Sequence, residues 1–72
     1  MSQQQTGTVK WFDEGKGFGF ITPTAGGDNF FFHISDLNGI GEDEVCAGLK
    51  VFFLAGRNDR GLAAHNVRKY AP

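Results

Sequence analysis

Hydrophobic and polar positions along the chain form five short segments, rich in aromatic and β-branched residues, that predict β-strands. They are Thr6–Phe12, Gly17–Thr22, Asn29–His33, Leu49–Ala55 and Leu62–Lys69. Turn-forming residues, chiefly Gly, Asp, Asn and Pro, separate them. The chain carries no long helical pattern and no internal repeat. The pattern predicts a single all-β domain, a barrel or a small sandwich, with no linker inside it.

Two neighbouring segments, Gly17–Thr22 and Asn29–His33, contain more aromatic rings than a small core requires. Side chains alternate between the two faces of a strand, so an antiparallel hairpin brings one set of rings to a common surface. That set is Phe18, Phe20, Phe31 and His33. Ile21, Phe30 and Phe32 take the opposite face and supply the core. Because flat rings beside lysines suit unpaired nucleobases, the sequence predicts a surface for single-stranded nucleic acid.

The direction of Trp11 is left open by the pattern. Strict alternation from a buried Val9 would place Trp11 inside, whereas a β-bulge or a strand end would turn it outward. Outside the strands, residues 1–5 are expected to form a disordered tail. Ser35 is expected to cap one helical turn, and residues 38–44 form a polar connection without helical periodicity.

Charge and composition narrow the classes of function. The 72 residues carry a net charge of −1 at a sequence pI of about 6.0, which argues against a strongly basic binder of duplex DNA. Lys10 and Lys16 nevertheless lie beside the aromatic segments, while residues 42–44 form a separate acidic loop. With Cys46 as the only cysteine and a polar start, we expect a cytoplasmic protein without a disulfide, an export signal or a membrane anchor.

Other chemistries find little support. His33 as a metal ligand would have only His65 and Cys46 as companions, without close ligand spacing, so no metal site is predicted. The glycines of residues 15–19 lack the third glycine and the helix of a dinucleotide fingerprint. No nucleophile–base pair or pair of catalytic carboxylates is apparent, so neither an enzyme nor a cofactor is expected.

Three runs of residues resemble the cold-shock domain family: Lys10-Trp11-Phe12, KGFGFI at Lys16–Ile21 and FFFHIS at Phe30–Ser35. The resemblance extends over roughly Thr6 to Val67, and the chain is similar to a stand-alone bacterial cold-shock protein. It implies a five-stranded antiparallel OB-type barrel over residues 6–70. It further implies binding of single-stranded RNA and DNA with low sequence selectivity. The implied role is that of an RNA chaperone that influences transcription and translation.

The resemblance also implies which residues bind nucleic acid. Carried over onto matching positions, they are Lys10, Trp11, Phe12, Lys16, Phe18, Phe20, Phe31, His33 and Arg60. The lysines would contact phosphates or base edges, the rings would stack on bases, and Phe12 would lie near the edge of the surface.

Several positions depart from the family pattern. Ile34 and Glu42 stand where aromatic residues are usual, so we expect weaker binding or a shorter footprint, at about 1–3 kcal/mol per lost stack. Asp13 replaces a common asparagine and adds a negative charge near Trp11. Leu62 replaces a usual proline, which should loosen the last loop.

Two alternatives concern protein contacts. Phe52 and Leu54 fall at outward positions, where they could form a patch for weak self-association of a monomeric chain or turn under the long loop. The aromatic surface could instead dock a peptide or another subunit, which would make the chain a protein-interaction module.

Overall fold

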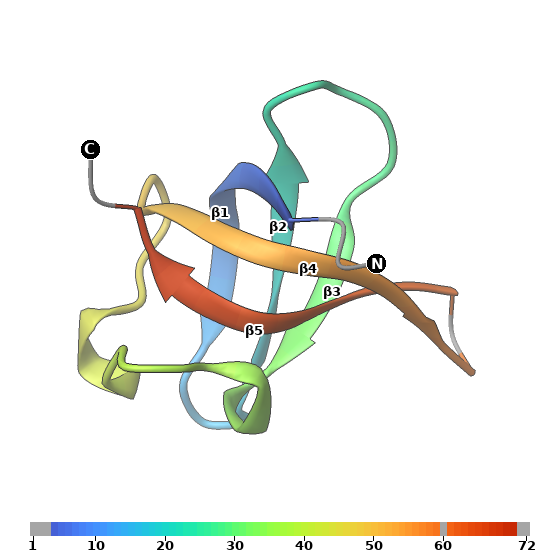
Figure 1. Ribbon diagram of the computed structural model, residues 1–72. Coiled ribbons are helices and arrows are strands. Elements are labelled where there is room, and N and C mark those ends of the chain that lie inside the picture. Colours follow the sequence, from blue (N-terminus) through green and yellow to red (C-terminus); the bar gives the residue numbers. More distant parts are fainter. Residues whose placement is uncertain (1–3, 60, 71–72) are drawn as a thin grey trace.

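The computed structural model describes residues 4–59 and 61–70, and it is a closed five-stranded barrel (Figure 1). The strands are β1 (Gln4–Asp13), β2 (Phe18–Pro23), β3 (Phe30–His33), β4 (Lys50–Asn58) and β5 (Gly61–Lys69). They follow one another around the barrel in the order β1-β2-β3-β5-β4. The predicted five-stranded OB-type barrel is therefore confirmed. One detail is corrected: β3 and β5 pair in parallel, with Phe31 opposite Ala63, while the other pairs are antiparallel.

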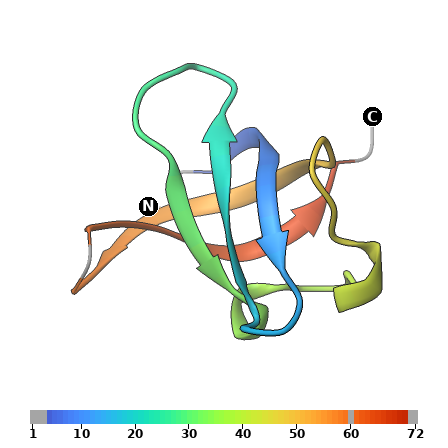
Figure 2. The ribbon, with the colours of Figure 1, turned by 180° about the vertical axis from the view of Figure 1, so that it is seen from behind.

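The core lies between two layers of strands. Strands β1, β2 and β3 form one layer, and β4 and β5 cross them on the other side of the core (Figures 1 and 2). Its residues are all at most 7% exposed, and Phe30, Phe32 and Ile21 belong to it as predicted. Among the described residues, the packed cluster comprises Val9, Ile21, Phe30, Phe32, Ile40, Val45, Val51, Phe53, Ala64 and Val67, and Ala63 is buried as well. Core residues from all five strands and from the loop before β4 close the barrel around one apolar interior.

Gly19 shows why a glycine stands inside β2. A Cβ atom there would overlap the carbonyl oxygen of Trp11 and approach a ring atom of Phe32 to 3.0 Å. Strands β1 and β2 therefore approach more closely at this point than a larger residue allows.

The start of β1 and the two short helical turns differ in detail from the sequence-based prediction. Gln4 and Gln5, assigned to the disordered tail, are part of β1 and pair with β4; residues 1–3 lie outside the described part. The turn predicted near Ser35 is the 3₁₀ helix η1 (Ile34–Asp36), but its cap is His33 rather than Ser35. The connection over residues 38–44, predicted without helix, contains the 3₁₀ turn η2 (Glu42–Glu44).

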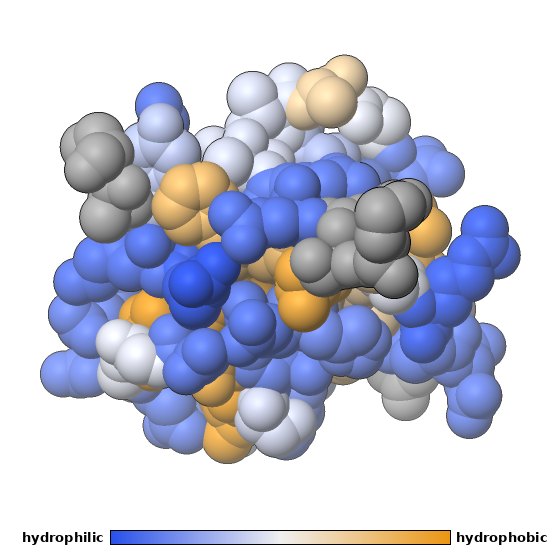
Figure 3. Space-filling view, in the orientation of Figure 1, coloured by the Kyte–Doolittle hydropathy of each residue, from blue (hydrophilic) through white to orange (hydrophobic). Residues whose placement is uncertain are grey.

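The face over β4 and β5 is mainly hydrophilic, with separate apolar patches (Figure 3). Phe52 is half-buried: its ring centroid lies 4.9 Å from that of Tyr70, and the Arg68 guanidinium lies 5.9 Å from the Phe52 centroid. Tyr70 and Arg68 therefore partly cover the Phe52 ring. Self-association through Phe52 and Leu54 remains a prediction.

Within residues 4–59 and 61–70, no helix has the length and apolarity needed to span a membrane.

Glu44 links η2 to the end of β5. From its contacts we expect the free energy of unfolding to decrease slightly at acidic pH. Glu44 accepts hydrogen bonds from the Gly41 N–H (3.0 Å) and from Lys69 Nζ (2.9 Å). These bonds, the backbone bond most strongly, hold the pKa of the Glu44 carboxyl below its ordinary value. A lowered folded pKa adds stability that is complete above the unfolded pKa and lost as pH falls through the folded pKa. We expect Glu44→Gln to lose less stability than the parent between about pH 6 and about pH 3, measured by urea denaturation. Equal losses would contradict this.

Candidate nucleic-acid interface

Four aromatic rings form a continuous surface on the outer side of β1, β2 and β3. We call Trp11, Phe18, Phe20 and Phe31 the aromatic platform. Its ring centroids are 5.4 Å apart for Trp11–Phe20, 5.6 Å for Trp11–Phe18 and Phe18–Phe31, and 5.8 Å for Phe20–Phe31. Each ring therefore contacts two others, in tilted or edge-to-face geometry. None of the four is buried, and Trp11 is 39% exposed. The platform can offer ring faces to a flat ligand while its edges support one another.

The hairpin of β2 and β3 places three of these rings by its register. Phe20 pairs with Phe31, and Phe18 pairs with His33. Residues directly opposite each other in an antiparallel pair project to the same face, so these side chains share the outer surface. The predicted grouping of Phe18, Phe20, Phe31 and His33 on one face is confirmed.

A β-bulge in β1 decides the direction of Trp11. Val9 pairs with Ile21, both of them buried, but the register shifts before the next pair, in which Trp11 lies opposite Phe20. Lys10 is the extra residue of this bulge. As a result, Lys10 and Trp11 are both exposed although they are consecutive, and Trp11 joins the face of Phe20. Of the two directions that the sequence left open, the outward one is observed.

His33 extends the surface beside Phe18, and its position is fixed by the hydrogen bonds that it makes as the N-cap of η1. Its Nδ1 accepts a hydrogen bond from the Ser35 N–H at 3.2 Å, and its backbone N–H donates to Asp36 Oδ2 at 3.0 Å. In the neutral imidazole, an accepting Nδ1 leaves the proton on Nε2. The ring therefore presents an N–H donor as well as an aromatic face.

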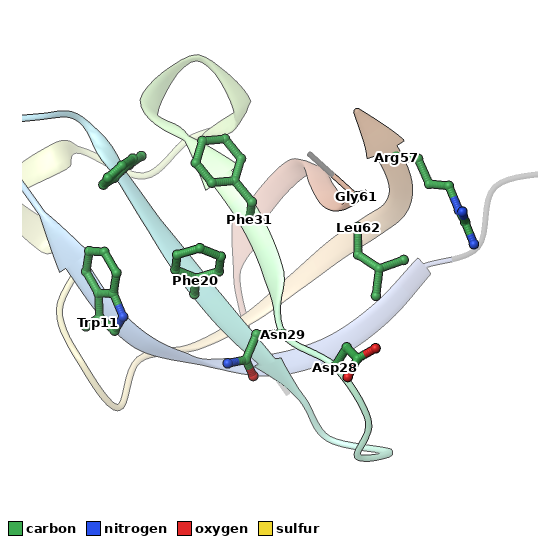
Figure 4. Close-up of a pocket in the computed structure, with 9 residues that line it drawn as sticks. Trp11, Phe20, Asp28, Asn29, Phe31, Arg57, Gly61 and Leu62 are labelled. Carbon is green, nitrogen blue, oxygen red and sulfur yellow. The ribbon is translucent and has the colours of Figure 1, made fainter. Parts of the chain in front are cut away.

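Two hollows adjoin the platform. The larger, about 710 Å³, has the four platform rings on one side and continues to Asp28, Asn29, Arg57, Gly61 and Leu62 (Figure 4). The smaller, about 500 Å³, is lined by Phe18, Phe31, His33, Asn58 and Asp59. The outer end of the β4–β5 hairpin thus forms a wall beside the platform.

The two lysines expected near the platform are both exposed. Lys10 precedes Trp11 in β1, and Lys16 lies in the turn that leads to Phe18. Asp13 orders this turn: its Oδ1 accepts the Lys16 N–H at 3.1 Å and its carbonyl oxygen accepts the Gly17 N–H at 2.7 Å. The carboxylate that replaces the common asparagine therefore makes an Asx-type turn contact.

Some predicted positions are not brought to the platform. Phe12 stacks on the buried Phe32, with centroids 5.7 Å apart and planes at 9°, so it packs against the core rather than at the edge of the surface. The expected edge position of Phe12 is corrected, because the bulge that turns Trp11 outward turns its neighbour inward. Ile34 is half-buried against Gly17, and Glu42 is exposed in η2. Arg60 lies outside the described residues.

Sequence reasoning assigned no binding role to the residues that line the larger hollow outside the platform. Arg57 and Leu62 lie more than 20 positions after the platform strands and carry no motif. They reach the platform because β5 closes against β3.

His65, with no assigned role, contacts Asp36 Oδ1 through Nδ1 at 3.1 Å. In the described part of the chain, no group of three or more His, Cys, Asp or Glu side chains could hold a metal ion.

Comparisons with known proteins agree on the family. The model of the 'Cold-shock' DNA-binding domain matches residues 5–70. The chain is 47% identical over 64 residues to cold shock protein CapA of Pseudomonas fragi, covering 89% of this chain and 100% of the relative. It is 46% identical over 68 residues to major cold shock protein CspA of Pseudomonas aeruginosa, covering 94% and 97%.

A solved structure supports the fold alone. The chain resembles drosophila Unr CSD456 with a TM-score of 0.77 at 21% identity, over 97% of this chain and 28% of that one. The aromatic platform, the barrel beneath it and the sequence matches agree, and the chain belongs to the nucleic-acid-binding cold-shock domain family.

Proposed function

We propose that the chain binds single-stranded RNA and DNA by stacking unpaired bases on the aromatic platform. The observation that carries the proposal is the set of four mutually contacting, solvent-accessible rings on one barrel face. A stacked base contributes about 1–3 kcal/mol, and every base has an aromatic face. Such binding tolerates many sequences and requires bases that are not already paired in a duplex.

Positive charge supports stacking in this proposal without dominating it. Lys10 and Lys16 are placed to contact phosphates or base edges, and His33 offers its ring face and an N–H donor. The whole chain has a net charge of −1. With few phosphates neutralised, affinity should fall less steeply with salt than for a basic binder of duplex DNA.

The proposed cellular role is that of a cytoplasmic RNA chaperone acting through residues 6–70. Free energy gained by each stacked base opposes closure of RNA hairpins and keeps transcripts open to transcription and translation. The mechanism uses no cofactor and no chemical turnover. Because binding is noncovalent and weakly selective, one molecule can serve many transcripts.

A fluorescence titration of the full chain tests the proposal. Trp11 is the only tryptophan and belongs to the platform, so a base stacking on it should quench its emission. We expect oligothymidine to quench Trp11 and a duplex of equal length to bind at least about tenfold more weakly, since its bases are already stacked. A chain that binds duplex as tightly as single strand would contradict the proposal. Absence of quenching and of binding would favour a protein partner for the platform.

A further inference from the structure

Arg57 and Leu62 lie beside the aromatic platform, at the end of the larger hollow opposite Trp11 (Figure 4). They are cross-strand partners in the β4–β5 hairpin, and both line the larger hollow. Leu62 is half-buried against the core, whereas Arg57 is exposed. In Figure 4, Leu62 lies between Phe20 and Arg57, and Trp11 is at the opposite end of the hollow. An apolar wall and then a cation therefore continue the line of the platform rings.

The charge of Arg57 is not engaged by the described part of the protein. Among the described residues, its guanidinium makes neither a hydrogen bond nor an ion pair, although Asp28 lines the same hollow. Two other cations of the chain are engaged elsewhere: Arg68 donates to Gln4 Oε1 at 2.8 Å, and Lys69 donates to Glu44 Oε2 at 2.9 Å. A planar guanidinium with free N–H groups is well suited to bind a phosphate in a bidentate manner.

We propose that Arg57 binds a backbone phosphate of the nucleic acid and that Leu62 packs against the adjoining sugar or base. The strand then runs from the Lys10 end of the platform, across its rings, to Arg57. Asp28 repels phosphate from its own part of the hollow, which confines the phosphate to the Arg57 side. This inference rests on the proposed function and adds a residue that fixes the path and the footprint of the strand.

Lys50 provides a matched control on the same strand. It is exposed, begins β4 seven residues before Arg57, and lines a different hollow with Thr6 and Tyr70. At about 3.3 Å per residue the two positions are roughly 20 Å apart. Arg57→Gln and Lys50→Gln therefore change the net charge equally, but only the first removes a cation from the hollow beside the platform.

The experiment measures binding of hexathymidine to the full chain by Trp11 quenching, from about 0.05 M to about 1 M salt. Loss of one phosphate contact should reduce the slope of log affinity against log salt by about 0.7. Arg57→Gln should therefore bind about eightfold more weakly at about 0.05 M salt and nearly as well as the parent at about 1 M. Lys50→Gln should keep the parent slope, and Arg57→Lys should keep it as well, because the charge remains.

The outcomes separate this inference from the proposed function. If Arg57→Gln shows the same slope and affinity as Lys50→Gln while the parent binds, Arg57 contacts no phosphate and the inference is wrong. If the parent itself does not bind hexathymidine, the proposed function fails first. A thermal melt of each variant verifies that both exposed substitutions leave the barrel folded.

Discussion

Replacing both Phe20 and Phe31 by alanine is expected to weaken binding of single-stranded oligothymidine by about 30-fold to about 10⁴-fold. The estimate assumes the loss of two base–aromatic stacks, each worth about 1–3 kcal/mol, with about 1.4 kcal/mol per tenfold change. The two rings are cross-strand partners with centroids 5.8 Å apart and line the larger hollow. Fluorescence anisotropy of a labelled oligothymidine is the suitable measurement. Trp11 contacts Phe20, so the substitution itself would change the emission of Trp11 and make quenching hard to compare.

Phe52→Ala is the control for this double variant. Phe52 is also half-buried and also contacts another ring, that of Tyr70, but it does not line either hollow beside the platform. We expect Phe52→Ala to bind as the parent does. If the double variant remained folded and bound oligothymidine as tightly as the parent, the platform would not be the nucleic-acid site.

Phe32→Ala is expected to leave most molecules unfolded or barely stable. Phe32 is fully buried and stacks on Phe12, so truncation should cost about 3–5 kcal/mol through lost burial and a cavity. At about 0.05–0.15 kcal/mol per residue, a 72-residue chain has roughly 4–11 kcal/mol in total, and small barrels fall toward the lower end. Urea denaturation followed by circular dichroism measures the loss.

The adjacent residue is the matched comparison for Phe32→Ala. Phe31 has the same side chain one position earlier in β3 but faces outward and is only half-buried. Phe31→Ala should therefore lose much less stability than Phe32→Ala, and it should lose binding instead. Equal stability of the two variants would contradict the assignment of opposite faces in β3.

Resemblance and strand pattern together predicted most residues of the candidate interface but not its limits. The matching positions include all four platform rings, His33 and the two lysines. The structure brings the rings and His33 to one side of the barrel, and both lysines are exposed. The family pattern placed Phe12 at the edge of this side, whereas its ring stacks on the buried Phe32. It assigned nothing to Arg57. Neither position follows from a motif, because Phe12 depends on the register of β1 against β2 and Arg57 on the closure of β5 against β3.

Alternation of side chains along β2 and β3 was sufficient to separate core from surface, since the two strands are neighbours in sequence and pair across a short loop. The direction of Trp11 required tertiary structure: it depends on a bulge whose register is set by pairing, and a shift of one residue reverses every side chain that follows. Closure of β5 against β3 likewise brought Arg57 and Leu62 beside the platform. Periodicity acts within a strand, whereas register and closure arise from contacts between strands, and the closing contact of β3 with β5 joins segments that are far apart in the chain.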